Sequence, residues 1–237
     1  ENHYLADDLN ILDESTSITI NASAINSLAG NASALINAYA SPGISGLGNE
    51  AVTISNTSID ASLLNILDGN TTGIINASTV STLVGNTSTL INTYSSTGIS
   101  GLGNEAVNVN YGEASVSSAN ILSEATTGLV TATISDGDMA KLVSLRGNNN
   151  AYTISISDDS VEASKLIELY EKTTAKINAS KVGALNGNSS DLNTLYSLSG
   201  IIGLGNEKIA ISDTSIDASL LNILDGNTTG EINASTV

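Results

Sequence analysis

Residues 58–80 read SIDASLLNILDGNTTGIINASTV, and residues 215–237 read SIDASLLNILDGNTTGEINASTV. The two stretches differ at one position, where Ile74 of the first corresponds to Glu231 of the second. A catalytic site needs each of its groups once, so near-verbatim copies indicate an array of structural units. We therefore expect the repeat, and not any single motif, to decide the fold.

Two landmarks return along the chain with a period of about 55 residues, which is shorter in the third unit. The Asn of the N-I-L core recurs at Asn10, Asn65, Asn120 and Asn222. A drifted copy, ASKLIELYEKTT around Glu168, lies between the last two. The string GISGLGNEAV at 43–52 returns at 98–107, and GIIGLGNEKI follows at 200–209. The landmarks predict a single array with units at approximately 1–58, 59–113, 114–160 and 161–215 and a partial unit at 216–237. The third unit is the shortest and the most divergent.

Within a unit, the pattern predicts a module made of a strand, an Asn or Asp, and a short helix. Asp60 and Asn76 each precede Ala-Ser and aliphatic residues, which is typical of a helix N-cap. Gly69 and Gly85 follow the last aliphatic residue, where a left-handed glycine commonly ends a helix. Apolar and polar residues alternate, as in half-buried strands, at 51–55, 107–109, 152–157 and 208–212.

The spacing of the modules favours parallel strands. The stretch between equivalent points such as Ile59 and Ile75 is too long for a hairpin and sufficient for a parallel crossover. Such crossovers are right-handed, and repeated units bury their apolar faces against their neighbours. We expect an α/β fold, specifically a right-handed α/β solenoid of tandem ~55-residue repeats with short parallel strands and short helices. Separate small α+β domains are the alternative, although no linker interrupts the period.

Composition and charge exclude several classes of partner. The 237 residues are 41% hydrophobic but include no Phe, Trp or Cys, so aliphatic side chains must form the core. The net charge is −17, and all seven basic residues lie between Lys141 and Lys208. Nucleic acids and anionic membranes require a basic surface, so we expect neither as a partner. No segment approaches the roughly 20 apolar residues of a membrane helix, so we expect no membrane insertion. Without an initiating Met or a signal peptide, the chain is expected to be a mature form or an excised piece.

The motif DGNTTG, at 68–73 and 225–230, resembles the first half of a calcium loop. It offers oxygen ligands at Asp68, Asn70, Asp225 and Asn227. The distal bidentate Glu of such a loop is replaced by Thr79 or Thr236. A helix C-cap and turn explains the same residues, so calcium, the one cofactor considered, stays an alternative.

The motif GLGNE supplies the best-kept acid of the array, at Glu50, Glu105 and Glu207. Its glycines predict a tight corner in which the Glu either receives backbone amides or shares a cation, so these glutamates are further calcium candidates. Tyrosines recur at the end of a predicted helix, at Tyr39, Tyr94 and Tyr196. They either stack on sugar rings or, as is more common at such a seam, pack inward with the hydroxyl at the edge.

Ten N-x-S/T triplets occur, and the recurring I-N-A-S contains Asn21, Asn76, Asn178 and Asn233. These residues are either glycan acceptors of a secreted protein or ladder residues that hydrogen-bond the turn above. Catalytic chemistry has little support, because the only His is His3 and acids are common throughout. We expect no enzyme.

The combination of V/I-x-A-S-x-L-N-x-L-D, I-N-A-S-x-V-x-T-L-x-G and G-I-x-G-L-G-N-E resembles the tandem repeats of very large cell-surface and secreted proteins of aquatic bacteria. The resemblance covers essentially the whole chain. It implies an extracellular or cell-surface repeat region of adhesive or layer-forming character, and it transfers no site residues.

Three hypotheses of function follow. The first is an extracellular structural segment that acts as a rigid spacer or adhesive stalk, with its acidity providing solubility. The second is a self-assembling filament or surface-layer subunit, in which neighbouring copies or further repeats stack head to tail. The third is a calcium-dependent or carbohydrate-binding module whose partners are surface glycans. All three rest on architecture and resemblance, a weaker basis than a site.

Overall fold

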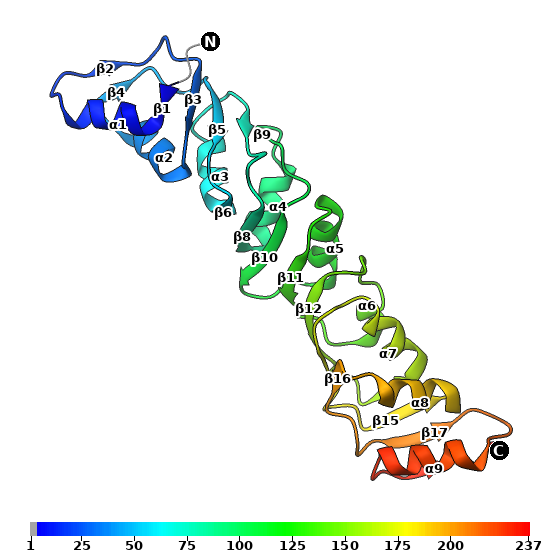
Figure 1. Cartoon of the computed structure of the whole chain (residues 1–237). Coiled ribbons are helices and arrows are strands. Elements are labelled where there is room, and N and C mark those ends of the chain that lie inside the picture. Colours follow the sequence, from blue (N-terminus) through cyan, green and yellow to red (C-terminus); the bar gives the residue numbers. More distant parts are fainter. Residues whose placement is uncertain (1–3) are drawn as a thin grey trace. The chain divides into compact units, whose positions relative to one another are not determined.

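The structure is a computed structural model that describes residues 4–237. The described residues form an α/β fold of nine helices and eighteen mostly short strands, with the element order shown in Figure 1. Each strand pair defined within this range is parallel. The expectation of an α/β fold with short parallel strands and short helices is therefore confirmed.

The helices are α1 (Ala6–Glu14), α2 (Ala32–Ala40), α3 (Ala61–Asp68), α4 (Thr87–Ser95), α5 (Val116–Ala125), α6 (Met139–Leu142), α7 (Ala163–Tyr170), α8 (Ser189–Ser197) and α9 (Ala218–Asn227). The strands of the first half are β1 (Tyr4–Leu5), β2 (Ile20–Asn21), β3 (Ser27–Gly30), β4 (Ile44–Ser45), β5 (Ala51–Ile54), β6 (Ser58–Asp60), β7 (Ile75–Asn76), β8 (Thr82–Asn86), β9 (Ile99–Ser100) and β10 (Ala106–Tyr111). Those of the second half are β11 (Val130–Thr133), β12 (Ala151–Ser155), β13 (Ser160–Glu162), β14 (Ile177–Asn178), β15 (Ala184–Gly187), β16 (Ile201–Ile202), β17 (Lys208–Ile211) and β18 (Ile232–Asn233).

The described residues form two compact units, residues 4–112 with 124–129 and residues 113–123 with 130–237. The first unit contains ladders in the orders β1-β3-β5-β7-β9, β6-β8-β10 and β2-β4. The second unit contains β11-β12-β14-β16 and β13-β15-β17-β18. The four alternating segments predicted as strands coincide with β5, β10, β12 and β17.

Paired strands are separated by a nearly constant stretch of chain, which we call the register step. Tyr4 pairs with Leu28, and Leu28 pairs in turn with Val52. Val161 pairs with Leu185 at the same separation in the second unit. The module length predicted from the match of Ile59 with Ile75 was wrong, because most steps contain a helix and two strand segments instead of one strand and one helix. The steps from β11 to β12 and from β17 to β18 contain one strand and one helix.

The sequence repeat exceeds two register steps by seven residues, and β5 and β6 account for the excess. Strand β5 pairs with β3 on one side and with β7 on the other. Ile59 of β6 lies seven residues after Val52 of β5, and it starts a separate ladder by pairing with Leu83 of β8. In the second unit, β12 and β13 divide their pairing between two ladders in the same way. Each sequence repeat therefore shifts the pairing by one strand position.

The prediction that Asp60 and Asn76 each begin a helix of the same module is correct for Asp60 and wrong for Asn76. Asp60 is the N-cap of α3, as expected, and its carboxylate accepts from the Ser62 amide. Asn76 instead lies in β7 and is followed by a turn and β8, because the Thr and Val residues of STVSTLV favour extended backbone. Gly85 lies in β8 and not at a helix end, since the next residue, Asn86, is the N-cap of α4. Gly69 is a C-cap but has a right-handed φ of −76°, so the left-handed prediction was wrong.

The core of each unit is aliphatic, as the composition predicts, and Asn side chains link successive helices. The amide of Asn10 in α1 donates at 2.9 Å to the carbonyl of Ala34 in α2, 24 residues later. Asn65 donates to the Thr89 carbonyl at 3.1 Å, also 24 residues away. The N-I-L asparagine thus connects one helix to the next across one register step.

Candidate functional site: recurrent tyrosine and glutamate pairs

The GLGNE motif forms a tight corner that depends on glycine. Gly46 and Gly48 have φ values of +85° and +135°, which side chains rarely adopt. A Cβ atom on Gly46 would also lie 2.8 Å from the backbone nitrogen of Ser23. The same positive φ values recur in the other two copies of the motif, at Gly101, Gly103, Gly203 and Gly205. The predicted corner is confirmed.

The glutamate of each corner is turned inward. Glu50 is 0% exposed, and its Oε2 accepts from the amides of Gly48 at 2.9 Å and Asn49 at 3.2 Å. The Tyr39 hydroxyl donates to Oε1 of the same carboxylate. The other two copies form the same pairs, Tyr94 with Glu105 and Tyr196 with Glu207. The prediction that the Glu receives backbone amides is confirmed, and sequence reasoning did not anticipate that its partner is the recurrent Tyr.

The protonation of these tyrosines follows from their surroundings. Burial, and then the hydrogen bond to the adjacent glutamate, raise the pKa of the Tyr39, Tyr94 and Tyr196 hydroxyls well above the usual value. Each hydroxyl therefore remains a proton donor to its carboxylate at neutral pH. Such a hydroxyl stabilises the turn and is a poor nucleophile.

A threonine 21 residues after each glutamate closes the same corner. The Thr71 hydroxyl donates to the Glu50 carbonyl at 2.9 Å, and Thr126 and Thr228 repeat the bond with Glu105 and Glu207. In the divergent unit, Thr173 donates across the same 21 residues to the carbonyl of Tyr152. Tyr152 thus occupies the position of the glutamate. It is fully buried, and burial raises its pKa to about 12.

The surroundings of the glutamates bear on the calcium hypothesis. Calcium takes six to eight oxygen ligands, whereas the partners of the Glu50 carboxylate are N–H and O–H donors that already occupy its lone pairs. Among residues 4–237, no group of three or more His, Cys, Asp and Glu side chains comes together. The geometry favours the backbone-amide interpretation of Glu50, Glu105 and Glu207.

The DGNTTG residues occupy a separate place. Asp68 is the last residue of α3, and its carboxylate accepts from the Ser96 hydroxyl at 2.7 Å. Asp13 at the end of α1 binds Ser41 in the same way, also 28 residues later. Asn70 is exposed after α3, while Asp225 and Asn227 are exposed within α9. Asp68 therefore joins the end of its helix to a turn of the following register step.

The I-N-A-S asparagines act locally. Asn76 Oδ1 accepts from the Ser78 amide at 3.0 Å, two residues on, and Asn178 bonds Ser180 likewise. Asn21 and Asn233 make the same bond with Ser23 and Ser235. The prediction of a bond to the turn above was wrong for these residues, because the short Asn side chain satisfies its own turn first. Of the four, Asn178 is half-buried and the others are exposed.

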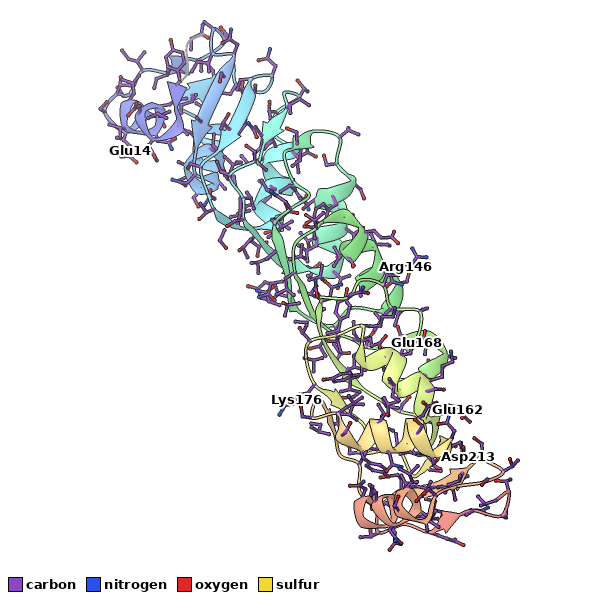
Figure 2. The ribbon with its side chains drawn as sticks, turned by 45° about the vertical axis from the view of Figure 1, so that its right-hand side comes forward. Glu14, Arg146, Glu162, Glu168, Lys176 and Asp213 are labelled. Atoms are coloured by element: carbon purple, nitrogen blue, oxygen red, sulfur yellow. The ribbon has the colours of Figure 1, made fainter. Side chains whose placement is uncertain are left out.

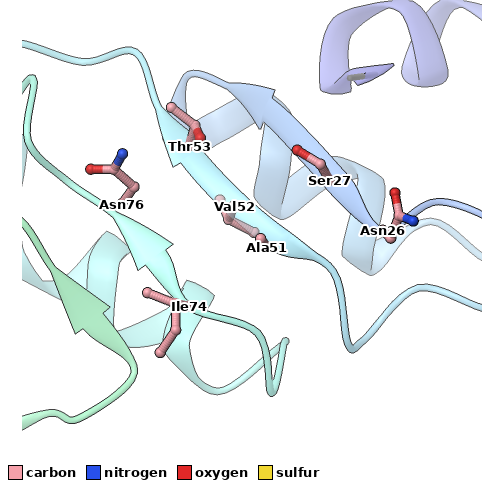
Figure 3. Close-up of a pocket in the computed structure, with 7 residues that line it drawn as sticks. All are labelled: Asn26, Ser27, Ala51, Val52, Thr53, Ile74 and Asn76. Atoms are coloured by element: carbon pink, nitrogen blue, oxygen red, sulfur yellow. The ribbon is translucent and has the colours of Figure 1, made fainter. Parts of the chain in front are cut away.

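Hollows on the described surface offer little chemistry near these pairs. One of about 380 Å³ lies on the strands β3, β5 and β7 and is lined by Asn26, Ser27, Ala51, Val52, Thr53, Ile74 and Asn76 (Figure 3). None of these side chains ionises, so the hollow has no acid, base or nucleophile of matched pKa. His3, the only histidine, lies outside the described residues.

Comparisons with protein-family models, curated proteins and solved structures found no match. Among the helices of residues 4–237, none is both long and apolar enough to cross a membrane.

Proposed function

We propose that the chain is a segment of an extracellular repeat array, a right-handed α/β solenoid that serves as a rigid spacer or adhesive stalk of a bacterial surface protein. The observation that carries the proposal is the register step. The pairing of parallel strands and the hydrogen bonds of asparagines in helices both connect positions 24 residues apart. Bonds repeated at one chain separation are what a stack of similar turns requires. Right-handed winding is expected because parallel crossovers have that hand.

Rigidity is supported by how each turn is held. The buried Tyr–Glu pairs, the Asp68–Ser96 bond and the Asn65–Thr89 bond each join different register steps or fix a corner. Bonds of this kind are individually worth about 1 kcal/mol, but an array repeats them along its length. A spacer needs resistance to bending more than it needs a reactive group.

Small-angle X-ray scattering with sedimentation velocity tests the proposal. A compact globule of this length would have a radius of gyration of about 18 Å, and we expect a clearly larger value and a monomer at two protein concentrations, with calcium or with chelator. A compact particle would refute the solenoid. Growth with concentration would favour the assembling alternative, and growth with calcium alone would make the DGNTTG and GLGNE acids ligands.

The surface location needs its own test. Antibody labelling of intact cells that produce the protein should detect it before permeabilisation. Signal that appears only after permeabilisation would refute an extracellular stalk, whatever the shape of the molecule.

A further inference from the structure

A groove between α5 and α6 in the second unit is lined by basic side chains. Its volume is about 490 Å³, within the range of small-ligand sites. Lys141 and Arg146 line it together with Asn120, Ser144 and Asp136. Lys141 and Arg146 are also the first two Lys or Arg residues of the chain, since the sequence contains neither type before Lys141.

The groove has a counterpart in the first unit with the opposite charge. Asn120 in α5 donates to the Ser144 carbonyl at 2.9 Å, as Asn10 in α1 donates to that of Ala34, and both bonds span 24 residues. The groove beside Asn10 is of similar size, about 440 Å³, and its ionisable lining residues are Asp7 and Glu14. The groove of the third unit therefore carries two bases beside one acid, Asp136, where the groove of the first unit carries two acids.

The basic side chains are positioned by neighbouring bonds. Lys141 Nζ lies 2.8 Å from Asp136 Oδ1 and 3.6 Å from Asp138 Oδ2, and Asp136 Oδ2 also accepts from the Val116 amide at 2.8 Å. The Arg146 amide donates to Asn120 Oδ1 at 2.8 Å, which fixes the backbone at the root of its side chain. In Figure 2, Arg146 projects from the ribbon on the side opposite to Lys176.

The lining also offers neutral hydrogen-bonding groups. Ser115 and Ser117 lie at the start of α5, and Ser144 lies across the groove. Hydroxyls, one carboxylate and two cations together can hydrogen-bond the hydroxyls of a sugar and pair with an acidic substituent on it. A guanidinium binds a carboxylate or sulfate through two parallel hydrogen bonds.

We infer that this groove binds an anionic saccharide, with the oxyanion between Arg146 and Lys141 and the sugar hydroxyls on the serines and Asp136. The net charge of −17 repels anions at long range, but a Debye length of about 8 Å at physiological salt screens it. The local charge is then set by Lys141 and Arg146 together with Asp136 and Asp138, which lie beside Lys141. Affinity is accordingly expected to be weaker at very low salt than at physiological salt. The inference does not depend on the spacer proposal, because it concerns one unit only.

Titration calorimetry on the whole chain tests the inference. The probes are an oligogalacturonate, a sulfated oligosaccharide, a neutral oligosaccharide of equal length and an oligoglutamate of equal charge. At least one acidic sugar should bind, and the neutral sugar should not. Binding of the neutral sugar at equal strength, equal binding of the oligoglutamate, or no binding at millimolar concentration would each overturn it.

Three variants locate the site. Arg146→Gln should weaken binding about tenfold or more, the usual effect of losing a hydrogen bond to a charged group. Lys176→Gln, an exposed base on the other side of the unit, should leave binding unchanged. Asp136→Asn keeps an oxygen for the Val116 amide but removes the ion pair that positions Lys141, so it should also weaken binding. An equal loss in Arg146→Gln and Lys176→Gln would show unspecific attraction and refute the groove.

Discussion

The carboxylates of the corner glutamates have only hydrogen-bond donors as polar neighbours. Burying an unpaired carboxylate costs several kcal/mol, and in Glu105 that cost is offset by the amides of Gly103 and Asn104 and by the Tyr94 hydroxyl. A buried polar group with all its bonds made specifies one geometry of the turn. The pair therefore accounts for the recurrence of both residues without a ligand.

Removing a tyrosine hydroxyl should lower the stability of the fold at a Tyr–Glu pair and leave it almost unchanged at an exposed tyrosine. Tyr94→Phe leaves the Glu105 carboxylate short of a donor, so we expect the free energy of unfolding to fall by about 1.5–3 kcal/mol in urea titrations. Tyr111→Phe, at an exposed tyrosine, should change it by less than about 0.5 kcal/mol. A cycle with Glu105→Gln should reveal coupling of about 1 kcal/mol or more, and additive effects would refute the pairing.

Tyr152 predicts a loss of stability in alkali. Its folded pKa is raised from 10.0 to about 12, by burial first, so the unfolded chain ionises before the folded one. The contribution is fully present below pH 10 and is lost as pH rises toward 12, by up to about 3 kcal/mol. Urea titrations at pH 9 to 12 should show this component in the wild type and not in Tyr152→Phe. Identical pH dependence in the two proteins would contradict it.

At the scale of the element, side-chain type decides between helix and strand where the motif is the same. ASLLNILD forms α3, with its buried leucines on one face, whereas the aligned residues after Asn76 form a turn and β8. The alternation predicted β5, β10, β12 and β17 correctly, and the N-cap role of Asp60 was also correct. The N-cap prediction failed at Asn76 because Ala-Ser after an Asx residue begins either a helix or a turn, and β-branched residues then select extended backbone.

Neighbouring residues of α3 allow a matched comparison of burial. Leu67 is 0% exposed and Ile66 is 47% exposed. Leu67→Ala should lower the free energy of unfolding by about 2–5 kcal/mol through lost burial and a cavity, and Ile66→Ala should lower it by less than about 1 kcal/mol. Similar losses, measured by urea unfolding, would show that the helix presents a different face to the core.

The helix-to-helix asparagine bond can be tested against a copy of the same motif. Asn65→Ala removes the bond to the Thr89 carbonyl and the bond that Asn65 Oδ1 accepts from the Thr93 hydroxyl at 2.9 Å, and it should cost about 2 kcal/mol. Asn222 has the same sequence neighbours but is exposed in α9, so Asn222→Ala should have almost no effect on thermal or urea unfolding. If Asn222→Ala costs as much, the asparagine acts through helix propensity and not through the bond.

At the scale of the whole chain, the sequence period and the register step differ. The N-I-L motif returns once per sequence period, for example from Asn10 to Asn65. Paired strand positions follow one another more than twice as often, since Val52 pairs with Ile75 and Ile75 pairs with Ile99. A sequence repeat contains two register steps and one additional strand position. The same set of contacts therefore returns only after a complete sequence repeat, and not after a single register step.

Deletion of a complete repeat should therefore be tolerated. Removing Asn10–Leu64, one full sequence period, joins Leu9 to Asn65, and the junction is equivalent to the original because Leu9 and Leu64 are both buried. We expect a cooperative unfolding transition and dispersed NMR amide signals. Removing only Asn10–Asp60 puts the following strands four residues out of phase and should abolish both. Equal behaviour of the two proteins would refute the repeat as the structural unit.

The sequence by itself determined the repeated α/β organisation, the parallel direction of the strands, the aliphatic core and the glycine corner, because these follow from local propensity and periodic burial. Only the tertiary structure decided the register step and the partner of each buried glutamate. Tyr39 and Thr71 reach Glu50 from 11 and 21 residues away. Such partners depend on which segments the fold brings together, since a carboxylate is buried only where distant donors converge on it.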